Sequence, residues 1–293
     1  MNGLDLQNLR NKSREIIKAE IGALLFNLGK THIGFWEKGK RGEQGQVIQH
    51  FCIDEGLFRN TYGYKKFSSY KDYFEEDKDT SENNFKIDLN RVDNGLEKFF
   101  YETTVDLGLA DNGANLKLSD IVYGGESEKE LVKRIMFRGC ENINSGIDKG
   151  APREEQQLAH LSISNPFGTF KEKMKEDMLD RQRLCFLQRL WNKLKGMPDN
   201  PDALTHKEWV EIRNFIINEI KSWYCHLLSD SRFPINDVTL WDQAYMTASM
   251  FKSALAAVCL DRNNYDLYRK NRIQLNGMCW VFSMTNWGWL KRL

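Results

Sequence analysis

The chain of 293 residues, 41% of them hydrophobic, is long enough for one large domain or two ordinary ones, each with a sizeable core. It carries 42 Lys and Arg against 41 Asp and Glu, and this formal net charge of +1 excludes a global electrostatic attraction to nucleic acid or membranes. No run of about 18 apolar residues could span a bilayer, and residues 1–9 lack the pattern of a signal peptide. We therefore expect a cytoplasmic protein without membrane contact.

The cysteine pattern indicates neither a disulfide framework nor a metal site. The cysteines are scattered, with no Cys-x-x-Cys pair and no histidine at the spacing of a zinc site. We expect them to be reduced and mostly buried, as small hydrophobic residues. They are Cys52, Cys140, Cys185, Cys225, Cys259 and Cys279.

Residues 4–28 form the first predicted element. Apolar residues recur there at helical spacing, charged residues are interleaved with them, and Gly29 ends the pattern. The spacing predicts an amphipathic helix. The apolar positions are Leu9, Ile17, Ile21, Leu24, Leu25 and Leu28, and the charged ones include Arg14, Glu15, Lys18 and Glu20.

A polar and irregular stretch follows at about residues 37–89. It has no apolar period, which predicts surface loops or an insertion into the first domain. Its aromatic residues are interleaved with lysines, a combination that could suit base stacking on single strands but more often anchors a long loop to the domain. These aromatic residues include Phe67, Tyr70, Tyr73 and Phe74.

Helical spacing returns in residues 96–100, 128–137 and 170–194. The sequence SGIDKGAPRE, residues 145–154, predicts a linker or sharp loop before the last of these helices. The Gly-Met-Pro break at residues 196–198 should end that helix.

The clearest helices lie near the C-terminal end. Thr205 and Glu208 form a capping-box signature, after which one apolar face continues for about six turns. Residues 240–260 repeat apolar and small residues, and their alanines permit close packing against a neighbouring helix. Short apolar runs after Arg272 predict a change to β-containing structure. The apolar face after Thr205 consists of Trp209, Ile212, Ile216, Ile220, Trp223 and Leu227.

Three segments that are far apart in sequence resemble segments of known proteins. They are LLFNLGKTH at residues 24–32, CENINSGIDKG at residues 140–150 and NDVTLWDQAYMTASMFKSALA at residues 236–256. The first is similar to the His-Asp segment of HD phosphohydrolases. All three, in this order, resemble the N-terminal region of the large subunit of type III CRISPR effector complexes. The second is similar to an Ala-Asp and Ser-Gly stretch of the large subunits, and the third resembles a long Asp-Val segment that ordinary HD hydrolases lack. Within this family, the Csx type of large subunit is the most similar.

The resemblance implies an HD site whose metal ligands have been replaced. Phe26 and Asn27 stand where the family has its His-Asp pair, Glu141 stands for an Asp, and Gln243 stands for a His. Such a site holds one or two divalent ions with imidazole and carboxylate ligands, so that a bound water can attack a phosphodiester. Phe26 offers no lone pair, and Asn27 and Gln243 offer only neutral amides. We therefore expect no catalytic residue, no bound metal and no other cofactor in this chain.

The other activity that the resemblance implies for the whole family is the synthesis of cyclic oligoadenylate from ATP. It requires a GGDD motif in a Palm domain, and no GGDD occurs here. Gly124-Gly125-Glu126 is the nearest sequence, and it precedes a predicted helix rather than occupying a hairpin turn. Neither a P-loop nor a Gly-x-Gly-x-x-Gly motif is present.

These expectations combine into one domain organisation. Residues 1–265 are expected to form a mainly α, HD-domain-like helical bundle, with irregular insertions at about 37–89. Residues 266–293 are expected to open a Palm-like, β-containing domain that is truncated. The resemblance implies a non-catalytic part of an RNA-guided antiviral ribonucleoprotein, whose partners are the other protein subunits, the guide RNA and the target RNA.

Two other hypotheses stay open at this point. One is a divergent metal-dependent HD phosphohydrolase or nuclease that acts on single-stranded DNA, with a site rebuilt from Glu141, Asp148, Asp242 and His32. The other is a helical interaction module unrelated to CRISPR, because aromatic and alanine-rich helices are most often core elements.

Overall fold

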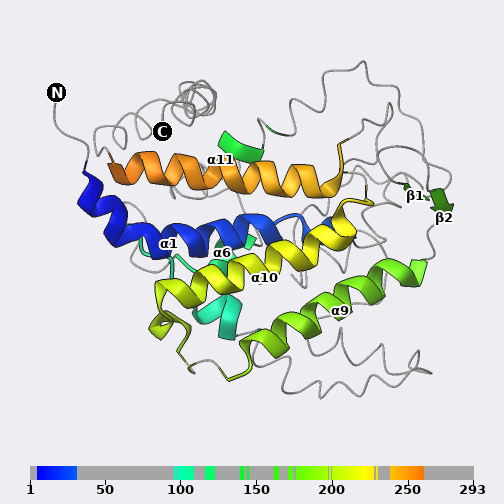
Figure 1. Ribbon diagram of the computed structural model, residues 1–293, viewed down its shortest axis with the longest axis horizontal. Helices are drawn as coiled ribbons and strands as arrows, with labels where there is room; N and C mark the ends of the chain where they lie inside the picture. The colour runs from blue at the N-terminus through cyan, green and yellow to red at the C-terminus, as the bar shows by residue number, and fades with distance from the viewer. Residues whose placement is uncertain are drawn as a thin grey trace, which may run out of the picture.

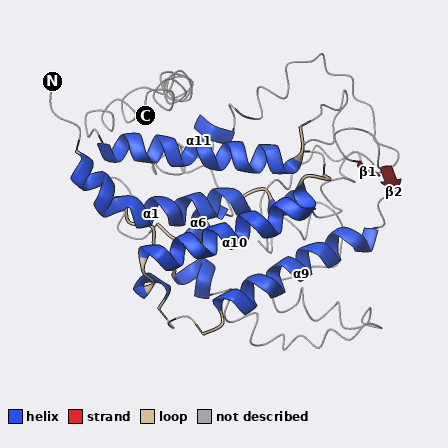
Figure 2. Cartoon of the chain, in the orientation of Figure 1, coloured by secondary structure: helices blue, strands red, loops and turns tan. Residues whose placement is uncertain are grey.

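The computed structural model describes part of the chain, and that part is mainly helical (Figure 2). This confirms the prediction of a mainly α fold. No helix in the described residues is long and apolar enough to cross a membrane. The described residues are 5–31, 96, 98–108, 116–122, 139–141, 144, 162–164, 171–173, 176–196, 198, 200–227, 229 and 238–260.

Helix α1, Leu6–Leu25, is the centre of the described body and packs against α11, α10 and α6 (Figure 1). The Asp5 side chain caps its start by accepting the Asn8 N–H at 2.8 Å. A 3₁₀ turn, η1, Leu28–Thr31, follows its end. The predicted helix is confirmed, but it is not amphipathic throughout, because every residue from Glu15 to Leu25 is buried.

Helix α11, Leu240–Leu260, runs antiparallel to α1 and has the predicted bounds. The Asp5 N–H donates to the Leu260 carbonyl at 2.8 Å, and Asn8 Nδ2 donates to the Cys259 carbonyl at 2.7 Å. These bonds satisfy carbonyls at the end of α11 that have no partner within the helix. The beginning of α1 therefore lies beside the end of α11.

Helix α10, His206–Tyr224, follows a short 3₁₀ turn, η6, Pro201–Ala203. The predicted capping box is present: Thr205 Oγ1 accepts the Glu208 N–H at 3.3 Å, and Glu208 Oε2 accepts the Thr205 N–H at 2.7 Å. The predicted apolar face is confirmed, since all six of its residues are buried.

Helix α9, Glu176–Leu194, begins later than predicted. Lys171–Lys173 forms strand β2, which pairs antiparallel with β1, Ser162–Ser164. The prediction of a helix from residue 170 is wrong, because Lys171–Lys173 has no apolar side chain to bury as a helical turn and its backbone pairs with β1 instead. The helix does end before Gly196, which has φ +92° and adopts a conformation that favours glycine.

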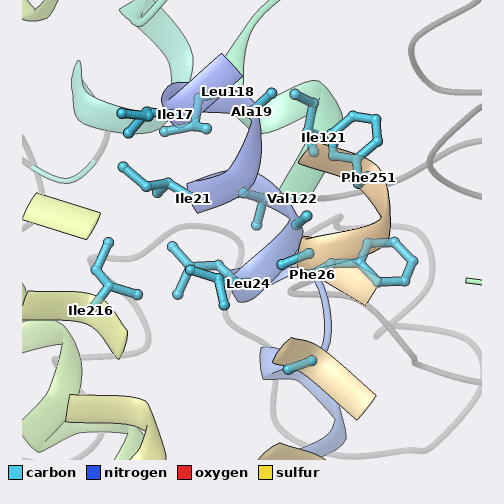
Figure 3. Packing of buried hydrophobic residues seen from close by; sticks show 14 of the residues in the cluster. Ile17, Ala19, Ile21, Leu24, Phe26, Leu118, Ile121, Val122, Ile216 and Phe251 are labelled. Carbon is cyan, nitrogen blue, oxygen red and sulfur yellow. The ribbon is translucent and has the colours of Figure 1, made fainter. Parts of the chain in front are cut away.

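Two short elements complete the body: the π-helical turn η4, Lys98–Glu102, and helix α6, Leu118–Val122. The predicted helical segment at 96–100 coincides with the start of η4. Gly22 of α1 lies so close to α6 that a Cβ there would be 2.7 Å from Ile121 Cγ2. Figure 3 shows Ile121 beside Val122 and Phe251 in the core that α1, α6 and α11 share.

Several predicted features lie outside the described residues. They are the insertion at about 37–89, the helix at 128–137, the loop at 145–154, the Gly124-Gly125-Glu126 segment and the Palm-like region 266–293.

Candidate functional site

Three of the four predicted HD positions, Phe26, Asn27 and Gln243, lie just after α1 or near the start of α11, at one end of the bundle. The end of α1 and the start of α11 lie there, because these two helices are antiparallel (Figure 1). The first half of α9 reaches the same end, where Arg183 Nη1 donates to Thr31 Oγ1 at 3.2 Å. The fold therefore places segments that are far apart in sequence around a common buried region.

Glu141 and Gln243 are in direct contact, although 102 residues separate them. Gln243 Nε2 donates to Glu141 Oε1 at 3.1 Å, and Thr247 Oγ1 donates to Glu141 Oε2 at 3.1 Å. Asn144 Nδ2 donates to Thr247 Oγ1 and to the Gln243 carbonyl, each at 2.9 Å. We call Glu141, Asn144, Gln243 and Thr247 the Glu141 cluster.

The Glu141 cluster is almost closed to solvent. Glu141 is 4% exposed, Asn144 6%, Gln243 2% and Thr247 0%. A buried carboxylate is strongly unfavourable unless its oxygens accept hydrogen bonds, and here both oxygens do so. The Thr247 hydroxyl accepts a hydrogen bond from Asn144 and donates its single proton to Glu141. The cluster thus fastens Glu141 and Asn144 to α11.

The donor set of the Glu141 cluster does not fit a divalent metal. Gln243 and Thr247 direct N–H and O–H groups at the carboxylate, so they compete with a cation for its oxygens. Hard cations prefer several charged oxygen ligands, and Glu141 supplies the single carboxylate of the cluster. Among the described residues, no group of three or more His, Cys, Asp or Glu could hold a metal ion.

Phe26 and Asn27, which the sequence analysis predicted to replace a His-Asp pair, are both fully buried. Phe26 is the residue that follows α1, and Figure 3 shows it in the hydrophobic core with Phe251 and Val122. Asn27 differs, because neither its Oδ1 nor its Nδ2 has a hydrogen-bond partner in the described part of the chain.

Asp242 and Gln243 are adjacent in sequence but serve different purposes. Asp242 Oδ2 accepts from the Thr239 N–H at 3.1 Å and from Thr239 Oγ1 at 2.7 Å, which caps the start of α11. Consecutive residues of a helix point about 100° apart, so Asp242 is exposed while Gln243 is buried. The other residues of the rebuilt-site hypothesis, His32 and Asp148, lie outside the described residues.

Sequence reasoning missed Asn144 and Thr247. Each lies within one helical turn of a residue that it did identify, since Asn144 is three residues after Glu141 and Thr247 is four after Gln243. That spacing places Thr247 on the same face of α11 as Gln243. This helical spacing is the sequence signal from which the complete cluster could have been predicted.

A second buried polar group, centred on Lys18, lies near the middle of α1. Lys18 Nζ is shared by Glu15 Oε2 at 3.1 Å, the Thr104 carbonyl at 3.0 Å and Asp202 Oδ1 at 2.8 Å. Burial alone raises the pKa of Asp202, but hydrogen bonds from Lys18 and Thr104 and the charge of Lys18 lower it overall. These contacts tie α1 to η6 and to the segment before α6, so we assign them to stability.

Comparison with known proteins adds no relative. No protein-family model, no curated protein and no solved structure matches this chain.

Proposed function

We propose that this chain is a non-catalytic, HD-like helical part of the large subunit of a type III CRISPR effector complex. In that role it contributes a rigid body to an RNA-guided antiviral ribonucleoprotein in the cytoplasm. Its partners are the other protein subunits and, through them, the guide RNA and the target RNA. The proposal rests on the three ordered sequence segments and on one observation in the fold.

That observation is the hydrogen bond between Glu141 and Gln243. The sequence resemblance alone assigns both positions to one metal site. In the fold, the two residues lie in one buried cluster. Their chemistry has changed from ligation of a cation to mutual hydrogen bonding. A cluster that satisfies its own carboxylate keeps the helices in place without metal, which supports a structural role.

A reversion experiment tests the proposal. The variant Phe26→His/Asn27→Asp/Glu141→Asp/Gln243→His restores the residue types of an HD site, and the wild type is its matched control. We expect the purified wild type to contain no stoichiometric transition metal and to leave single-stranded DNA intact in manganese or nickel. We expect the reverted protein to bind either metal in equilibrium dialysis.

Two results decide the outcome. Metal-dependent cleavage by the wild type that Glu141→Gln abolishes would refute the non-catalytic role. Expression of the wild-type chain in its native host tests the partnership separately, because a subunit of a ribonucleoprotein should co-purify with a small RNA. Purification without any RNA would favour a helical module unrelated to CRISPR.

One observation favours the second candidate, a divergent metal-dependent phosphohydrolase. The buried amide of Asn27 has no hydrogen-bond partner among the described residues, and an unpaired buried amide is costly in free energy. A ligand or cation that Asn27 Oδ1 contacts would explain its retention. Metal analysis of wild-type protein purified without chelators separates the candidates, because a stoichiometric metal lost in Asn27→Leu would support the hydrolase.

A further inference from the structure

We draw no further inference here: the strongest candidate, the surface stack of Lys221, Trp241 and Tyr245 where the end of α10 meets the start of α11, is a patch for which nothing in the described part of the chain shows what covers it.

Discussion

Replacing Thr247 by Val should show what the Glu141 cluster contributes to stability. Val has nearly the shape of Thr, so the substitution removes a hydroxyl without opening a cavity. Glu141 Oε2 loses the donor now at 3.1 Å, and Asn144 Nδ2 loses an acceptor at 2.9 Å. A hydrogen bond to a charged group contributes about 1.5–3 kcal/mol and a neutral one about 1 kcal/mol. We expect Thr247→Val to lower the free energy of unfolding by roughly 2–4 kcal/mol.

Thr103 provides the matched control. Like Thr247 it is 0% exposed, but its Oγ1 has no hydrogen-bond partner in the described part of the chain. Thr103→Val removes an unpaired buried hydroxyl, so the free energy of unfolding should stay constant or rise. Urea unfolding followed by circular dichroism measures both variants, and an unchanged m-value shows that the midpoints report stability. Equal losses in Thr103→Val and Thr247→Val would refute the assignment of hydrogen bonds in the cluster.

The remaining predictions concern the centre of the body. Gly22→Ala should lower the melting temperature, because the added Cβ would lie 2.7 Å from Ile121 Cγ2. Overpacking destabilises the fold by about 1–3 kcal/mol, which exceeds the gain of about 1 kcal/mol from the better helix propensity of Ala. The loss should shrink in an Ile121→Ala background, and a loss of the same size there would contradict the steric cause. Folding lowers the pKa of Asp202. The Asp202 carboxylate therefore stabilises the fold at pH values above its unfolded-state pKa, and this stabilisation disappears as the pH falls through its folded-state pKa. Asp202→Asn should therefore weaken the fall in stability below about pH 4, and acid titrations of equal slope would contradict this.

Local sequence patterns were sufficient for the main helices. The capping box at Thr205 and the apolar face that follows depend on residues within a few positions of one another, and both are present in the fold. The same holds for α11, whose bounds match its apolar pattern. The start of α9 was mispredicted because the backbone of Lys171–Lys173 pairs with a strand that no local pattern shows.

The sequence by itself determined that the segments of α1, α10 and α11 are helical. Only the tertiary structure decided where charge is buried and what satisfies it. Lys18 and Glu15 are buried because η6 and the Thr104 segment supply partners, and Glu141 is buried because Gln243 and Thr247 donate to it. Helix formation depends mainly on neighbours within about four residues. A buried polar cluster depends on residues that meet only when the chain has folded, and Glu141 and Gln243 meet across 102 positions.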